Sequence, residues 1–155
     1  MRTIMTIRNT IIAISLLILS SYSSACALHL VKSEGPDGAT WNTINSQIAM
    51  QNGVIEPITI LGENASHQRS MWLMRLLSRH LDNENLPSSN IYISDVGLWS
   101  TLDSSAGKVR FDDQVNDSDS YMLITTPVIN AILSGTLSFE SAINLELIQA
   151  FPPSV

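Results

Sequence analysis

Cysteine is almost absent from this chain, which has a single one, Cys26, among its 155 residues. That residue lies within the first 27 positions, which have the features of a secretory signal. Cleavage after Ala27 would leave a chain with no cysteine and therefore no disulfide bond. The stability of the remaining protein is expected to come from packing alone.

Basic residues are also scarce. The chain has eight Lys and Arg against fourteen Asp and Glu, a net charge of −6 at pH 7. Arg2 and Arg8 lie in the first 27 residues, which hold no acidic residue, so the rest of the chain has six basic and fourteen acidic residues and a net charge of −8. Such a surface repels phosphate backbones and anionic lipid surfaces. We therefore expect no nucleic-acid partner.

Long hydrophobic runs are missing as well. Residues 11–19 (IIAISLLIL) are a short apolar run between a positively charged start and the A-x-A arrangement Ala25-Cys26-Ala27, a pattern typical of a secretory signal. The run is well short of the roughly 20 residues that span a bilayer, so we expect no stable membrane span after signal removal. Residues 1–27 are thus predicted to be a signal peptide, and the protein to be periplasmic or secreted. The alternative is a bacterial lipoprotein that is acylated on Cys26.

Recognisable catalytic and metal-binding motifs are absent. The chain has no G-x-S-x-G and no H-E-x-x-H pattern. His67 and His80 stand thirteen positions apart, whereas ligand pairs on one helix need a spacing of about three or four. Residues 112–119 (DDQVNDSD) hold four carboxylates, but Tyr121 stands where a calcium loop needs its next oxygen ligand. We therefore predict no catalytic residues, no cofactor and no metal, and a protein that is not an enzyme.

The chain does have enough apolar sequence for one folded core. It is 45% hydrophobic and 14% charged, as globular domains are. The turn cluster at residues 35–38 (GPDG) predicts that residues 28–39 are a flexible loop, followed by a single domain over residues 40–155. Thr40 can cap a first helix over residues 41–51, which we expect to be a surface helix whose apolar side carries Ile44 and Ile48, with Trp41 at the same helical spacing. A short strand is expected over residues 57–61 (PITIL).

The strongest helical pattern covers residues 62–81. Five residues at helical spacing predict a buried stripe: Ser70, Leu73, Met74, Leu77 and Leu81. Gln68, Arg75 and Arg79 share the opposite side. This pattern predicts a helix that lies on a sheet with its basic side in solvent.

Three short alternating runs predict the sheet itself, over residues 91–96, 108–111 and 121–125. Turn residues between the first two indicate an antiparallel hairpin or meander rather than repeated βαβ units. The fold class that follows is α+β, with a small and mostly antiparallel sheet covered by helices.

The last 30 or so residues read as two apolar helices after a strand. Pro127 suits the first turn of a helix, where its missing N–H costs nothing. Gly135 suits the left-handed position that ends it, and Ser138 can cap the next helix. That second helix is expected to continue to Ala150, with a buried stripe of Phe139, Ala142, Ile143, Leu147 and Ala150.

Residues 93–148 resemble the C-terminal half of the SCP2-like (sterol carrier protein 2) domain. The shared features are a Trp-containing strand, a hairpin around a Gly, a strand ending in Thr, an apolar helix, the turn LSGTLS at residues 133–138 and a helix with Ala142. Members of that family have a sheet covered by helices and shelter a lipid or acyl chain in an apolar tunnel. The resemblance thus implies an apolar small molecule as ligand.

Two functions follow as hypotheses. The first is an exported binding protein that shelters an apolar ligand between the sheet and the C-terminal helices, with six residues expected to line the cavity: Val128, Ile132, Leu133, Phe139, Ile143 and Leu147. The second is a non-catalytic accessory or structural envelope protein whose apolar C-terminal helices dock on a partner protein. Taken singly, each of the six residues is better explained as plain core.

Overall fold

The computed structural model describes residues 35–59, 61–81, 89–103, 108–111 and 120–152. Four helices are found in these residues: α2 (Ala39–Gln51), α3 (Glu63–Leu81), α4 (Thr126–Leu133) and α5 (Phe139–Asn144). The five strands are β1 (Ser89–Ile93), β2 (Leu98–Asp103), β3 (Lys108–Arg110), β4 (Tyr121–Ile124) and β5 (Gln149–Phe151). The predicted signal peptide, Cys26 and the acidic run 112–119 lie outside the described residues.

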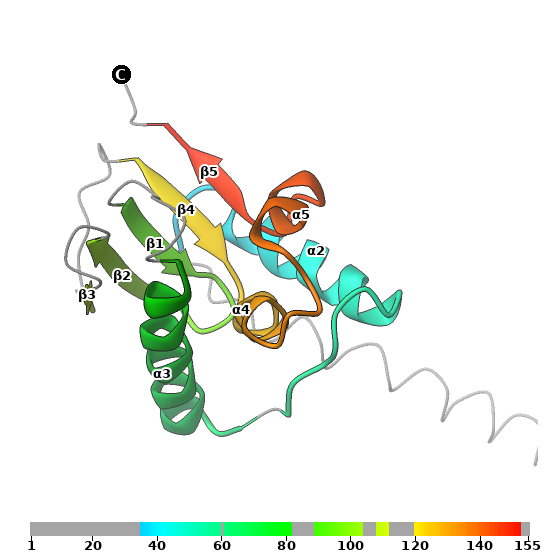
Figure 1. Ribbon diagram of the computed structural model, residues 1–155, viewed down its shortest axis with the longest axis horizontal. Helices are drawn as coiled ribbons and strands as arrows, with labels where there is room; N and C mark the ends of the chain where they lie inside the picture. The colour runs from blue at the N-terminus through cyan, green and yellow to red at the C-terminus, as the bar shows by residue number, and fades with distance from the viewer. Residues whose placement is uncertain (1–34, 60, 82–88, 104–107, 112–119, 153–155) are drawn as a thin grey trace, which may run out of the picture. The chain divides into compact units, whose positions relative to one another are not determined.

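The strands form one sheet in the order β3-β2-β1-β4-β5 (Figure 1). β1 pairs antiparallel with β2, β2 with β3 and β4 with β5, whereas the central pair, β1 and β4, is parallel. The predicted α+β fold with a mostly antiparallel sheet is therefore confirmed. Because β1 and β4 run in the same direction, their carboxyl ends meet at one edge of the sheet.

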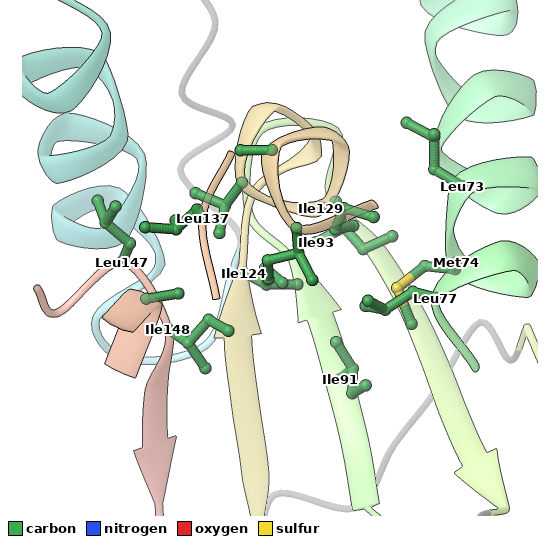
Figure 2. Close-up of a cluster of buried hydrophobic side chains, with 14 of the residues drawn as sticks. Leu73, Met74, Leu77, Ile91, Ile93, Ile124, Ile129, Leu137, Leu147 and Ile148 are labelled. Atoms are coloured by element: carbon green, nitrogen blue, oxygen red, sulfur yellow. The ribbon is translucent and has the colours of Figure 1, made fainter. Parts of the chain in front are cut away.

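Alternate residues of β1 serve two different cores, as the two-residue period of a strand requires. Ile91 and Ile93 are 3% and 0% exposed and belong to the main core with α3 and α4. Figure 2 shows Met74 and Leu77 of α3 pointing toward this layer. Each such fully buried side chain stabilises the fold by about 1.5–3 kcal/mol relative to an exposed one.

The opposite face of the sheet carries an aromatic row from four strands. The centroids of Tyr92 and Trp99 are 4.8 Å apart, those of Trp99 and Tyr121 5.8 Å, and those of Tyr121 and Phe151 5.0 Å. The start of α2 closes over one end of the row, where a side chain on Gly38 would meet the Phe151 ring at 2.7 Å. This second core ties the N-terminal end of the described chain to β4 and β5.

Helix α3 follows its sequence pattern closely. All five residues of the predicted stripe are buried, and Ser78 is buried beside them. Arg75 and Arg79 are exposed on the other side, and the Arg75 guanidinium lies 5.3 Å from the centroid of the Phe111 ring. The prediction of a helix with its basic side in solvent is confirmed.

Helix α2 buries its polar side, which the sequence pattern did not predict. Asn42 and Ser46 are 0% and 2% exposed, whereas Trp41 and Ile48 are 56% and 47% exposed. The apolar side predicted through Ile48 is therefore not the buried one. The reason is that polar side chains at the ends of β1 and β4 form hydrogen bonds with the side chains of α2 that face inward.

Helix α4 begins and ends where the sequence predicts. Pro127 lies in its first turn, and Gly135, with a φ of 75°, follows its end in the left-handed region that favours glycine. Ser138 then caps α5, because its side chain accepts a hydrogen bond from the backbone N–H of Ser141.

The predicted strand over residues 57–61 is wrong. Residues 56–59, 61 and 62 are irregular, with Ile58 half-buried and Leu61 exposed. Pro57 has no N–H to give to a ladder, and both edges of the sheet are formed by other segments, β3 and β5.

The predicted length of the last helix is also wrong. α5 ends at Asn144, Glu146 takes a φ of 57°, and the amides of Leu147 and Ile148 both bond to the carbonyl of Ala142. The chain then forms β5, which pairs with β4. The residues that helical periodicity had assigned to the end of α5 therefore pair with the edge of β4 as a strand. Ala150 is exposed instead of buried.

Candidate functional site: a groove beside the turn between α4 and α5

A groove lies between the end of α4, the start of α5 and the last turn of α3. Its volume is about 350 Å³, which falls in the lower range of ligand pockets, roughly 300–1,000 Å³. The lining residues are His80, Ile132, Leu133, Ser134, Gly135, Leu137, Ser138 and Phe139. In Figure 1, the orange segment that leads from α4 to α5 is the turn whose residues line one side of the groove.

The turn that forms one side of the groove is fixed by its own hydrogen bonds. The carbonyl of Ala131 accepts from the backbone N–H groups of Thr136 and Leu137, at 3.0 and 3.2 Å. The hydroxyl oxygens of Ser134 and Thr136 each lie 3.0 Å from the same carbonyl oxygen and 3.0 Å from each other, so their two protons supply two of these three possible hydrogen bonds. With the left-handed Gly135 at its centre, this turn is preformed rather than shaped by a ligand.

The walls of the groove are apolar and anchored in the main core. Ile132 and Leu137 are 3% and 8% exposed and are members of that core. Leu133 and Phe139 are only partly buried and pack against it from the groove side. Two side chains of the groove therefore offer apolar surface to a ligand on a rigid base.

The groove also has a polar rim. The Ser138 hydroxyl accepts from the Ser141 N–H at 3.0 Å and donates to the Ser141 hydroxyl at 2.7 Å, and the Ser134 hydroxyl bonds to Ala131 and Thr136. His80 stands in the last turn of α3 and is exposed. Both serines are thus committed to the turn, whereas the histidine faces solvent.

The six residues predicted to line a cavity are found in three different places. Ile132, Leu133 and Phe139 line the groove together. Val128 and Leu147 are 0% and 2% exposed in the main core, and Ile143 is 47% exposed on the surface. The predicted buried stripe of the last helix is therefore wrong at Ile143, whereas its members Ala142 and Leu147 are buried.

A second set of residues, a buried polar cluster at the carboxyl ends of β1 and β4, was missed by the sequence reasoning. Its members are Asn42, Ser46, Ser70, Ser94, Asp95, Thr125 and Thr126. The signal was the pair of polar dipeptides at residues 94–95 and 125–126, where β1 and β4 end. Ser94, Asp95 and Thr125 were instead assigned to the predicted strands over residues 91–96 and 121–125.

Hydrogen bonds join the helices to the strand ends through this cluster. The Asn42 amide donates to the Leu147 carbonyl at 3.1 Å and its oxygen accepts from the Ser94 hydroxyl at 3.0 Å. The hydroxyls of Ser46 and Thr125 lie 2.7 Å apart, and those of Ser70 and Thr126 lie 2.9 Å apart. Each polar group of the cluster thus has a hydrogen-bond partner, and these bonds hold α2 and α3 in place on the sheet.

Asp95 is the ionisable member of the cluster. Burial raises the pKa of its carboxyl group above the ordinary value of 3.8, and hydrogen bonds from the N–H and hydroxyl of Thr126 offset part of this effect. In the part of the chain that the structure describes, no three His, Cys, Asp or Glu side chains gather as a metal site would require. His67 and His80 lie at opposite ends of α3.

Within the same described ranges, no helix has both the length and the apolar character that a bilayer crossing requires.

Comparison with known proteins gives one partial similarity. No protein-family model matches the chain, and no curated protein matches it. Among solved structures, the crystal structure of sterol carrier protein 2 like 2 (SCP2-L2) from Aedes aegypti is similar, with a TM-score of 0.40 and 15% sequence identity. The match covers 56% of this chain and 87% of that one. The similarity is weak and partial.

Proposed function

We propose that this protein is an exported binding protein that holds an apolar ligand, such as the acyl chain of a lipid, in the groove between α4, α5 and the end of α3. The observation that carries the proposal is the groove itself, with Leu133 and Phe139 partly exposed above the buried Ile132 and Leu137. The predicted signal over residues 1–27 supports export.

The energetics of such binding rest on apolar contact. Each methylene of a ligand that leaves water for the groove wall contributes about 0.8 kcal/mol. Because the turn between the helices is already fixed by the Ala131 carbonyl and Gly135, little ordering of the protein opposes binding. A chain with several contacting methylenes would therefore bind with useful affinity without many polar contacts.

The test is titration of the purified protein with dodecanoic acid by calorimetry, on matched variants. Leu133→Asp places a charge against the ligand and should weaken binding about tenfold or more. Ile143→Asp makes the same chemical change on α5 outside the groove, where Ile143 is 47% exposed, and should leave binding unchanged. Equal effects of both variants, with circular dichroism showing both folded, would contradict the proposal.

A second candidate is the accessory role, docking on an envelope partner through the C-terminal helices. The observation in its favour is that Ile143 and Leu145 are 47% and 50% exposed next to each other on and after α5. Native mass spectrometry after gentle purification distinguishes the two: a retained lipid supports the binding protein, and a stable protein partner or self-dimer supports the accessory role.

A further inference from the structure

Helix α2 exposes to solvent the apolar side that an amphipathic helix normally buries. Trp41 and Ile48 are 56% and 47% exposed, and Ile44 lies between them, half-buried. Residues at this spacing lie along one side of a helix. We call the row of Trp41, Ile44 and Ile48 the outer stripe of α2. An exposed apolar surface of this kind is typical of a contact with another molecule.

The orientation of α2 is fixed from its other side. The Asn42 side chain bonds to the Leu147 carbonyl at 3.1 Å and to the Ser94 hydroxyl at 3.0 Å. The hydroxyl of Ser46 lies 2.7 Å from that of Thr125. Because these groups are buried, a rotation of α2 that hid the outer stripe would leave them without partners. The outer stripe therefore faces outward because the fold holds it there.

The charges of the chain indicate which partner fits this surface. None of the thirteen residues of α2 is charged, whereas the chain has a net charge of −6. The helix offers no carboxylate to a basic protein. It also offers an anionic lipid surface none of the Lys and Arg that helices lying on membranes carry. A second copy of the same acidic chain is repelled least where two charge-free surfaces meet.

The outer stripe is also complementary to itself. Trp41 and Ile48 are seven positions apart, or about 10.5 Å along the helix axis, and Ile44 stands near the midpoint. When two such helices pack antiparallel, the Trp41 ring of each copy lies against the Ile48 side chain of the other. The same contact is then made twice about a two-fold axis, as in an isologous dimer.

We propose that the protein forms a symmetric dimer in which the α2 helices of two copies pack antiparallel through their outer stripes. This interface is independent of the proposed function, because none of its three residues lines the groove. It also differs from docking through the C-terminal helices, which would use Ile143 and Leu145.

The experiment is sedimentation equilibrium of the purified protein over a range of concentrations, with two matched pairs of variants. Trp41→Ala should weaken dimerisation about tenfold or more, because tryptophans dominate interface energetics and the change acts twice in a symmetric dimer. Trp72→Ala removes a tryptophan of α3 that is 57% exposed, and should leave the dimer unchanged. Ile48→Asp should also weaken the dimer about tenfold or more. Ile143→Asp, at the same exposed fraction of 47%, should have no effect.

The orientation is measured in an equal mixture of isotope-labelled and unlabelled copies. The antiparallel dimer predicts intermolecular NOEs between the Trp41 ring of one copy and the Ile48 methyl groups of the other. Intermolecular NOEs between the two Trp41 rings in their place would contradict the arrangement.

A wild-type protein that stays monomeric at the highest concentration measured would overturn the inference. Equal effects within either matched pair, with circular dichroism showing all variants folded, would do the same. Loss of the dimer in Ile143→Asp but not in Ile48→Asp would place the contact on the C-terminal helices instead. Binding to phosphatidylglycerol vesicles that Trp41→Ala abolishes, without a dimer, would assign the outer stripe to a membrane. None of these outcomes bears on the dodecanoic acid titration, which tests the proposed function separately.

Discussion

The carboxyl group of Asp95 accepts a hydrogen bond of 2.9 Å from the backbone N–H of Thr126, the first residue of α4. The first N–H groups of a helix have no partner within the helix. Here the acceptor comes from the turn after β1, thirty-one positions earlier in the chain. The end of one central strand thus caps the helix that follows its parallel neighbour.

Asp95→Ala should lower the free energy of unfolding by about 1–2 kcal/mol, because the Thr126 N–H would lose its acceptor in a buried position. Asp95→Asn keeps an acceptor oxygen in the same place and should cost clearly less at neutral pH. Urea denaturation of both variants measures the difference. If the two substitutions cost the same, the cap contributes nothing and the contact is incidental.

The same carboxyl group should make stability depend on pH. Burial raises its pKa in the folded protein above 3.8, so between these two values the folded state holds a proton that the unfolded state has released. Stability from this group is therefore fully present below about pH 3.8 and is lost as the pH rises through the raised folded pKa. Asp95→Asn removes this loss.

The measurement is the difference in unfolding free energy between Asp95→Asn and the wild type, from urea denaturation at successive pH values. It should shift in favour of the variant as the pH rises above about 4 and then level off. A difference that stays constant across the range, or moves toward the wild type, would show that the folded pKa is not raised.

Asn42 should be among the more sensitive polar positions. Asn42→Ala leaves the Leu147 carbonyl and the Ser94 hydroxyl without their partner, and the expected loss is about 2–3 kcal/mol of unfolding free energy. Asn45→Ala, at a half-buried position of the same helix, is the control and should stay within about 0.5 kcal/mol of the wild type. Comparable losses at both positions would mean that the buried amide has no special role.

Alanine substitutions at Gly38 and Gly53 distinguish the cost of backbone strain from the cost of a steric clash. Both have positive φ, 84° and 70°, but a side chain at Gly38 would meet Phe151 at 2.7 Å, whereas at Gly53 nothing lies within 4 Å. Gly53→Ala should cost about 1–2 kcal/mol from the left-handed backbone alone. Gly38→Ala should cost about 1–3 kcal/mol more, because the aromatic row must shift. Thermal or urea denaturation of both variants measures this, and equal costs would mean that the row is loosely packed.

The parts of the fold that were predictable are those that hydrophobic spacing and backbone geometry determine locally. The stripe of α3 around Met74 and Leu77 is buried as its periodicity requires, and Pro127 and Gly135 mark the two ends of α4. In these segments the local signals and the tertiary structure agree, so a sequence pattern suffices.

The parts that were not predictable depend on partners far away in the chain. Asn42 faces inward because Leu147, 105 positions later, offers its carbonyl, and a helical wheel cannot contain that information. Likewise, residues 149–151 form a strand because the edge of β4 is open to them. The lining of the groove was predicted only in part. Ile132, Leu133 and Phe139 lie in or beside the apolar turn and do line it. Ile143 was included because the last helix was expected to continue to Ala150, whereas α5 ends at Asn144 and Ile143 is on the surface.

The most direct test of the proposed function is an NMR measurement of intermolecular NOEs between the methylene protons of bound dodecanoic acid and the protein. The groove predicts contacts to the Leu133 methyl groups and the Phe139 ring, and none to the Ile143 side chain on the surface of α5. NOEs confined to Ile143 and Leu145, or no NOE to any side chain at saturating ligand, would contradict the assignment of this groove as the binding site.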